Sequence, residues 1–347
     1  MRAVIIGGAG FLGSHLIDLL LERNYSILCI DRDGCDSTYL DSIGIPIVFG
    51  DIMDRDSIEK HLQEDDIVFH LAALLGVARV SREQYFKVNV DGVVNVLEAA
   101  ISKKARAFVF PSSTGAMGPV GSPEKPMDED TAPRPDSVYG KTKLVAEEKI
   151  REIGADKITS IAFRAPPIFG PRSAPKASTT VLFNSMRKKT LIIVGDTENF
   201  FPLCYVKNLI AAMVTFTEQK QSGHHMYIIA DGEPSRFNEI LMMIRNEFGI
   251  NKRIVHVPFW FAYPIAWTFD MLGKLLHFRP VLSRYVVLGM AKSLYFHDIS
   301  KALNDGYQPV ATLAEGIHET AEWMNSEQGQ GADPQRAAEA VSRPAPR

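Results

Sequence analysis

The segment YGKTK, at positions 139–143, carries a tyrosine and a lysine four residues apart. On a helix this spacing places Tyr139 and Lys143 on the same face. A free tyrosine has a pKa of about 10, which is too high for a base at neutral pH. A neighbouring ammonium, and the positively charged ring of an oxidised cofactor, would both favour the phenolate. Tyr139 would then take a proton from an alcohol, or return it in the reverse direction. The pair alone is common in proteins, so its meaning depends on the elements around it.

A hydroxyl that could hold the substrate oxygen is expected near this pair. The stretch AFVFPSS, at positions 107–113, reads as a strand that ends near Ser112 and is followed by Thr114. Ligands of parallel α/β sheets bind at the carboxyl ends of strands, and we select Ser113 as the hydroxyl donor. Its neighbours Ser112 and Thr114 remain alternatives, and Thr142 is expected to lie beside the tyrosine and lysine without a role.

A glycine-rich loop, GGAGFLG at positions 7–13, lies between an expected strand (3–6) and an expected helix (11–22). Glycines in this context allow a tight turn and a close approach of the backbone to a pyrophosphate, which the helix N-terminus also attracts. The loop therefore predicts a dinucleotide site. The residues expected to contact the cofactor here are Gly7, Gly10, Phe11, Leu12 and Gly13.

An acidic residue follows at the distance that a dinucleotide site requires. Asp31 ends the second expected strand (26–31), where its carboxylate would accept from the adenosine ribose and repel the extra phosphate of NADP. The sequence therefore favours NAD, although Arg32 next to it could serve NADP. Asp51, followed by Ile52, comes after the third strand (45–50) and is expected at the adenine, with a helix cap as the alternative reading.

Apolar runs continue to alternate with helical patterns up to about residue 170. Strands are expected at 67–71 and within 158–166, and helices at 88–102 and 139–153. This alternation predicts an α/β fold with a doubly wound parallel sheet of the Rossmann type in residues 1–170. Residues 171–326 read as a smaller, mixed substrate-binding part, from which some segments rejoin the first. Its expected helices are 206–216, 237–248 and 313–324, and residues 327–347 are expected to be disordered.

Composition excludes several other classes. The net charge of −3 gives no basic excess for nucleic acid. The longest apolar stretch, residues 257–269, is too short to span a bilayer and contains Pro264, although contact with a membrane interface stays open. Three cysteines without a cluster predict no metal site and fit the reducing cytoplasm.

Taken together, these motifs resemble the extended short-chain dehydrogenase/reductase family of NAD-dependent epimerases and dehydratases. The resemblance runs to about residue 324 and includes HLAA at 70, VNVDGVVNVLEAA at 88, SST at 112, YGKTK at 139 and FRAPPIFGP at 163. It implies that Ser113, Tyr139 and Lys143 form the catalytic triad. It also implies a homodimer formed through the helices 88–102 and 139–153. Further cofactor or support residues, by the same resemblance, are Leu71, Ala72, Ala73, Asn89 and Pro166.

The sequence leaves two substrate classes open. The segments 279–309 and FRAPPIFGP at 163 resemble 3β-hydroxysteroid dehydrogenase/isomerase-type members. The apolar segments 199–208 and 258–276 favour a steroid-like or lipid-like alcohol. A nucleotide-sugar epimerase or dehydratase is the alternative, since Arg187, Arg279 and Arg284 could hold a diphosphate. A sensor of NAD(P) without catalysis is a third hypothesis, which the presence of Tyr139 and Lys143 disfavours.

The first prediction concerns cofactor choice. NAD should bind more tightly than NADP, and Asp31→Ala should narrow that difference by about tenfold, or roughly 1.4 kcal/mol, because it removes the repulsion of the phosphate. Calorimetry measures both affinities. Equal or tighter binding of NADP by the unmodified protein would show that Arg32 dominates the choice.

Overall fold

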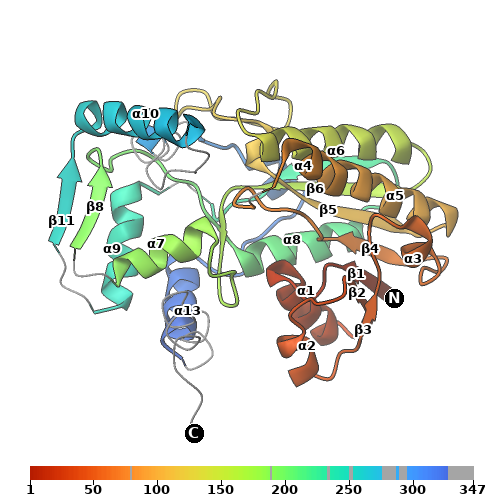
Figure 1. Ribbon diagram of the computed structural model, residues 1–347. Coiled ribbons are helices and arrows are strands. Elements are labelled where there is room, and N and C mark those ends of the chain that lie inside the picture. The colour runs from red at the N-terminus through yellow and green to blue at the C-terminus, as the bar shows by residue number, and fades with distance from the viewer. Residues whose placement is uncertain are drawn as a thin grey trace, which may run out of the picture.

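The computed structural model describes residues 1–78, 80–187, 190–232, 235–249, 253–275, 287–288 and 295–326. The larger part is built on a seven-stranded sheet in the order β10-β6-β5-β4-β1-β2-β3, and every neighbouring pair is parallel (Figure 1). The strands are β1 (Arg2–Ile6), β2 (Ser26–Asp31), β3 (Ile47–Phe49), β4 (Ile67–His70), β5 (Ala107–Ser113), β6 (Thr159–Ala165) and β10 (His224–Ile228). This confirms the predicted doubly wound α/β fold.

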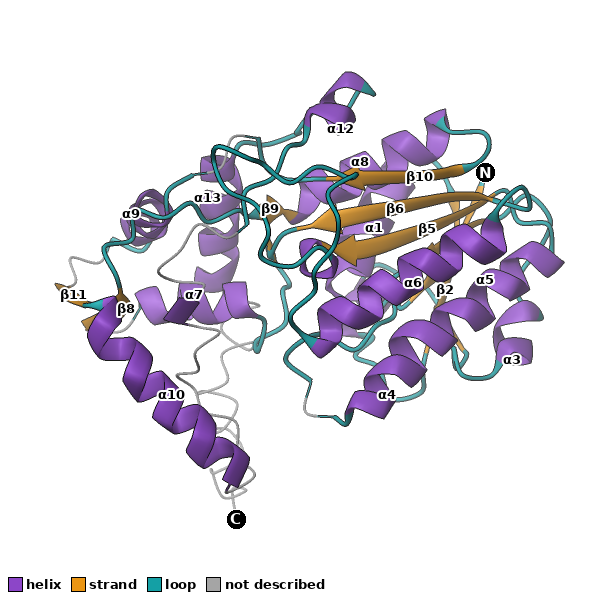
Figure 2. Cartoon of the chain, turned by 90° about the horizontal axis from the view of Figure 1, so that it is seen from above, coloured by secondary structure: helices purple, strands orange, loops and turns teal. Residues whose placement is uncertain are grey.

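Helices cover both faces of this sheet because successive strand residues point to opposite sides. Ile5 and Phe69 belong to the apolar core on the side of α1 and α8, whereas Val68 and Phe108 belong to the core on the side of α5 and α6. Figures 1 and 2 show these two helical layers. The helices of the larger part are α1 (Phe11–Glu22), α2 (Thr38–Ser42), α3 (Arg55–Glu59), α4 (Arg82–Phe86), α5 (Gly92–Ser102), α6 (Val138–Gly154) and α8 (Val206–Gln219).

The smaller part lies beyond one end of the sheet and contains both helices and strands (Figure 1). Two short parallel ladders, β7 with β9 and β8 with β11, accompany its helices. Its elements are β7 (Ile168–Phe169), α7 (Ser178–Met186), β8 (Thr190–Val194), β9 (Cys204–Tyr205), α9 (Phe237–Glu247), β11 (Arg253–Val257), α10 (Phe259–Leu275), α12 (Ser300–Asn304) and α13 (Leu313–Asn325). No helix among the described residues is long and apolar enough to cross a membrane.

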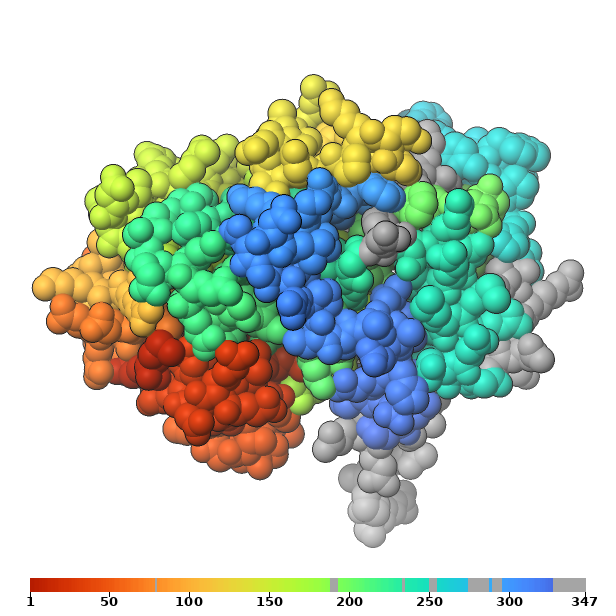
Figure 3. All heavy atoms as spheres, turned by 180° about the vertical axis from the view of Figure 1, so that it is seen from behind, coloured from red at the N-terminus to blue at the C-terminus, as the bar shows by residue number. Residues whose placement is uncertain are grey.

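The chain passes between the two parts more than once. After α7 and β8, it returns to the larger part to form α8 and β10, and β10 adds to the sheet beside β6. Residues 295–326 then fill the surface between the parts, drawn in blue in Figure 3. Asn208 donates to the carbonyl of Ala311 at 2.8 Å, and His318 contacts Glu247 of α9 at 2.7 Å. The C-terminal segment therefore ties the sheet to the smaller part.

Two expected elements differ in length. The helix expected at 88–102 begins earlier, at α4, because Ser81 and Gln84 form a capping box at positions 81–84. The π-helix η1 (Lys87–Asp91) joins α4 to α5. The third strand covers only Ile47–Phe49, at the edge of the sheet. The tail 327–347, predicted to be disordered, lies outside the described residues.

Candidate active site

The residues predicted from sequence come together at one edge of the sheet. Since the seven strands are parallel, their carboxyl ends lie along the same edge. In sheet order from β3 to β6, the residues at or after these ends are Asp51, Asp31, Gly7, Leu71, Ser113 and Pro166. Ligands bind along this edge in folds of this kind, so the order runs from an adenosine side at β3 to a reacting side at β5 and β6.

The glycine loop is packed so closely that side chains would not fit. The N–H of Gly7 donates to the carbonyl of Ile30 at 2.8 Å, and a Cβ on Gly7, which has φ +85°, would lie 2.7 Å from the nitrogen of Ala72. A Cβ on Gly13 would lie 2.3 Å from the Gly8 carbonyl oxygen. No side chain caps the N-terminus of α1, which leaves N–H groups of its first turn for an anion. The loop therefore fits a dinucleotide pyrophosphate.

Asp31 is held beside this loop by two backbone donors. Its Oδ2 accepts from the N–H of Ala9 at 3.0 Å, and its Oδ1 accepts from the N–H of Arg32 at 2.8 Å. The carboxylate thus lies at the mouth of the glycine loop, where an adenosine ribose would meet it. The preference for NAD over NADP stays a prediction, since the Arg32 side chain is exposed next to it.

Asp51 supports a turn on the adenosine side. Its Oδ1 accepts from the N–H of Met53 at 2.9 Å, whereas the N-cap of α3 is Asp54. The carbonyl of Ile52 accepts from Asn95 at 2.9 Å, which ties this turn to α5. Asp51 is exposed, and its expected contact with adenine stays a prediction.

Asn89 connects three parts of the site. It lies in the π-helix η1, is buried, and exchanges hydrogen bonds with both backbone groups of Leu74, at 2.7 and 3.0 Å. Its amide also donates to the hydroxyl of Thr142 at 3.2 Å. Ala72 and Ala73 begin the loop that Asn89 holds, and the N–H of Ala72 donates to the carbonyl of Ile6 at 3.0 Å. Asn89 therefore fixes the loop after β4 against α6.

Ser113, Tyr139 and Lys143 meet where α6 begins beside the end of β5. The pKa of Tyr139 is raised to about 12, because the effect of burial exceeds the opposite effect of a hydrogen bond with the Ser113 hydroxyl. The Nζ of Lys143 lies 6.0 Å from the centre of the Tyr139 ring and donates to the carbonyl of Pro111 at 2.8 Å. Burial lowers the pKa of Lys143 to about 8. The three groups can share a proton with one substrate oxygen.

A glycine allows this approach of α6 to β5. Ser137 caps the helix and accepts from the N–H of Gly140 at 3.0 Å. A Cβ on Gly140 would lie only 2.1 Å from the carbonyl oxygen of Gly115. Gly115 belongs to the short helix η2 (Thr114–Ala116) that follows Ser113. The glycine of YGKTK therefore sets the distance between the serine and the tyrosine.

The expectation that Thr142 has no role is wrong. Its side chain is buried at 0% exposure. Its hydroxyl donates to the carbonyl of Tyr139 at 2.8 Å and accepts from Asn89. Thr142 is thus part of the support of the site. Lys141 on the same helix is exposed, which makes it a suitable position for a control substitution.

A buried ionic cluster lies one helical turn beyond Lys143, and sequence reasoning missed it. Arg164 of β6 pairs with Glu147 of α6 at 2.8 Å, with the two side chains only 7% and 3% exposed. Glu147 also accepts from the hydroxyl of Ser112. The cluster joins β6 to β5 and α6, the two elements that carry Ser113, Tyr139 and Lys143. The sequence did contain a signal for this cluster. Arg164 lies inside the apolar run of β6, and a buried charge needs a partner of opposite charge.

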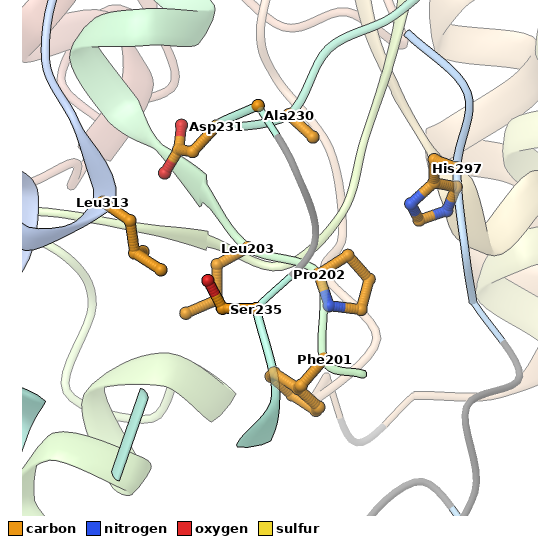
Figure 4. Close-up of a pocket in the computed structure, with 9 residues that line it drawn as sticks. Phe201, Pro202, Leu203, Ala230, Asp231, Ser235, His297 and Leu313 are labelled. Atoms are coloured by element: carbon orange, nitrogen blue, oxygen red, sulfur yellow. The ribbon is translucent and has the colours of Figure 1, made fainter. Parts of the chain in front are cut away.

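A narrow cavity opens at the same carboxyl edge, beside β10. The volume of the cavity together with the open solvent at its mouth is about 340 Å³. Figure 4 shows the residues around it, which come from the segment before β9, from the loop after β10 and from the C-terminal segment. The lining residues are Phe201, Pro202, Leu203, Ala230, Asp231, Gly232, Ser235, His297 and Leu313.

The fold and the glycine loop are those of a dinucleotide-dependent enzyme. The model of the NAD dependent epimerase/dehydratase family matches residues 3–230. The chain belongs to this family. The match ends just after β10, the last strand of the central sheet. The family assignment confirms the predicted class of enzyme and NAD as the cofactor of that class.

Relatives within the family have different substrates. The chain is 28% identical over 343 residues to the decarboxylating sterol-4-alpha-carboxylate 3-dehydrogenase of Schizosaccharomyces pombe, covering 94% of this chain and 98% of the relative. It is 29% identical over 282 residues to the UDP-N-acetyl-alpha-D-glucosaminuronate decarboxylase of Bacillus cytotoxicus, covering 76% and 85%. A UDP-glucose 4-epimerase of Thermus thermophilus, solved in complex with NAD, superimposes with a TM-score of 0.74 at 23% identity, covering 94% and 100%. Overall identity therefore does not separate apolar from sugar substrates.

The second prediction concerns the buried cluster. Glu147→Gln should lower the free energy of unfolding by about 3–5 kcal/mol, because it leaves the Arg164 guanidinium buried without its counter-charge. Chemical denaturation measures this change. Glu148→Gln, the exposed neighbour on α6, is the matched control and should change the free energy by less than about 0.5 kcal/mol. Similar values for both variants would show that the cluster does not hold these elements together.

Proposed function

We propose that this enzyme transfers a hydride between NAD and a secondary alcohol or ketone carbon of an apolar, steroid-like or lipid-like substrate. NAD, when bound, accepts the hydride in oxidation and supplies it in reduction. Tyr139 takes the hydroxyl proton as a phenolate in oxidation and donates it as a phenol in reduction. Ser113 hydrogen-bonds the substrate oxygen, and the ammonium of Lys143 favours the phenolate and binds the nicotinamide ribose.

The observation that carries the apolar substrate is one wall of the cavity at the carboxyl edge. Phe201, Pro202 and Leu203 form this wall in succession, and Leu203 is buried in the core. A small number of polar groups in an apolar lining is typical of sites for apolar ligands. The cavity lies at the edge where β5 presents Ser113, so a substrate that extends from Tyr139 toward β10 would reach this wall.

A nucleotide-sugar epimerase or dehydratase is the second candidate, and its diphosphate would need cations. Of the arginines considered for this role, Arg187 donates to the carbonyl of Met324 at 2.7 Å and contacts Asn325. Arg279 and Arg284 lie outside the described residues. Arg236, the residue after the lining residue Ser235, forms an ion pair with Glu198 at 3.1 Å. The partners of Arg187 and Arg236 favour the apolar substrate over the diphosphate.

A third candidate, a sensor that binds NAD(P) without catalysis, has no use for a proton-transfer group. The buried lysine and the glycine that brings Tyr139 to Ser113 both support an enzyme. A sensor could bind the dinucleotide through the glycine loop and Asp31 alone. We therefore retain the oxidoreductase as the proposal.

The third prediction concerns the proton-transfer group. Tyr139→Phe keeps the ring volume but removes the hydroxyl, so turnover should fall by about 10²–10⁴-fold. The affinity for NAD should change little, because the glycine loop and Asp31 lie elsewhere. Single-turnover absorbance of reduced cofactor measures the loss. Lys141→Gln, exposed on the same helix, is the control; near-normal hydride transfer by Tyr139→Phe would refute the role of the tyrosine.

The substrate class is tested by offering both kinds of substrate with NAD. Steroid alcohols should reduce NAD, whereas UDP-glucose should neither bind in calorimetry nor undergo epimerisation. Binding of UDP-glucose at micromolar concentration, without turnover of any steroid alcohol, would favour the nucleotide-sugar candidate instead.

The homodimer stays a prediction. On the helix expected at 88–102, Val93, Val96 and Leu97 are buried in the core of a single chain and are not available for a dimer contact. The support that remains comes from half-exposed apolar side chains on the same two helices, Val94 on α5 and Leu144 and Val145 on α6. We propose that they meet across a two-fold axis. Light scattering should give a dimer at micromolar concentration for the full chain and a monomer for Leu144→Arg.

Contact with a membrane interface also stays a prediction. Helix α10 exposes Trp260, Phe261, Trp267, Met271 and Leu272, at 41–74% of their surface. Aromatic side chains on an exposed apolar face are typical of helices that lie in a membrane interface. Cosedimentation with phosphatidylcholine vesicles tests this contact. The three cysteines are free thiols, which agrees with the proposed cytoplasmic location.

A further inference from the structure

One histidine in the cavity beside β10 has no partner in the described part of the chain. His297 is 6% exposed, and neither of its ring nitrogens has a hydrogen bond. Figure 4 shows its imidazole directed from the C-terminal segment toward Pro202 and the space between them. Buried polar groups are normally paired with protein or water, so this imidazole is free to hydrogen-bond a group that enters the cavity.

The backbone around His297 is fixed. The N–H of Met127 donates to the carbonyl of Phe296 at 2.7 Å, and the N–H of Asp298 donates to the carbonyl of Met127 at 2.7 Å. The ring of Phe296 also packs edge-on against Phe200, with centroids 5.0 Å apart. Met127 belongs to the loop that connects Ser113 with Tyr139. The backbone on either side of His297 is therefore held by the loop that joins Ser113 to Tyr139.

The charges around the cavity decide which ligand atom fits. Burial lowers the pKa of His297 to about 4, so the ring is neutral at pH 7 and can either donate or accept one hydrogen bond. Asp231 is the other titratable group in the lining, and burial raises its pKa to about 6. Its carboxylate is already engaged by the N–H of Tyr205, at 2.7 and 2.8 Å, and by Asn208 at 2.8 Å. Figure 4 shows it turned away from His297.

Among the described lining residues, the neutral hydrogen-bonding side chains are those of His297 and Ser235, and none carries a cation. Phosphate and carboxylate ligands are recognised by Arg, Lys or protonated His, and none of the lining residues is an arginine or a lysine. An anion would also lie near the carboxylate of Asp231. An uncharged hydroxyl or carbonyl oxygen satisfies the imidazole without bringing a charge into the cavity.

We propose that His297 binds an uncharged hydroxyl or carbonyl group at the end of the substrate remote from the reacting carbon. This inference rests on the proposed function and adds to it that the apolar substrate is polar at both ends. Tyr139 and Ser113 take the oxygen on the reacting carbon, and His297 takes the distant oxygen. The segment from Phe201 to Leu203 contacts the apolar body between them.

A matched pair of probes tests this inference. One is the androstane diol with hydroxyls on its first and last rings, and the other is the androstane mono-alcohol that lacks the last-ring hydroxyl. Equilibrium dialysis with the full-length protein measures their binding without turnover. The wild type should bind the diol about tenfold more tightly, the ratio expected for one buried hydrogen bond. His297→Phe should remove this preference while retaining the mono-alcohol.

Two further variants separate binding from a fault in folding. His297→Gln keeps a hydrogen-bonding group and should retain part of the preference, whereas His225→Gln, at the amino end of β10 on the opposite edge of the sheet, should retain all of it. Equal binding of the two probes by the wild type, binding of neither, or a preference that survives in His297→Phe would overturn the inference. Reduction of NAD by the probes is measured separately. Preferential binding of the diol without any NAD reduction would support the role of His297 while contradicting the proposed function.

Discussion

The close approach of α6 to the end of β5 is the constraint on which the site depends. A side chain on Gly140 would collide with the carbonyl of Gly115, so the helix can lie against η2 only because this residue is glycine. A glycine inside a helix costs roughly 0.5–1 kcal/mol relative to alanine. The Glu147–Arg164 pair then fixes the next turn of the helix to β6. Together they hold Tyr139 and Lys143 on a rigid frame, whereas a loop would let them move.

The polar groups of this protein are arranged in two layers behind the reacting groups. Asn89 and Thr142 fix the beginning of α6 to the loop after β4, and Ser112 and Glu147 fix its third turn to β5. Both layers are buried, so water does not compete for their hydrogen bonds. The cavity beside β10, where we propose that the substrate extends, has a more apolar lining, with Phe201, Pro202 and Leu203 along one wall. Such a site can exclude water from a hydride transfer while it retains a precise proton donor.

The sequence predicted most of what depends on local patterns. The glycine loop, Asp31, Ser113 and the tyrosine–lysine helix were each predicted from a short local pattern, and the structure places them along one edge of the sheet. What escaped prediction depends on distant partners. Thr142 looked like an ordinary helix residue because its contact with Asn89 joins positions 53 residues apart. The early start of the helix at α4 was legible in Ser81 and Gln84, but the π-helix that follows has no comparable local signal.

The return of the chain to β10 has a consequence for how the protein is made. During synthesis, the chain must emerge to about residue 228 before the seventh strand of the sheet can be added. Until then β6 is an open edge with unpaired backbone groups, which is a site for wrong pairing with other chains. The pairing of β10 with β6 also joins residues that are more than 60 positions apart, which slows folding because the intervening loop must close first. A fragment that stops near residue 170 would keep the cofactor loop and the catalytic groups but expose this edge permanently. The nucleotide-binding half is therefore not a separable module: translation completes it only after much of its companion has been made.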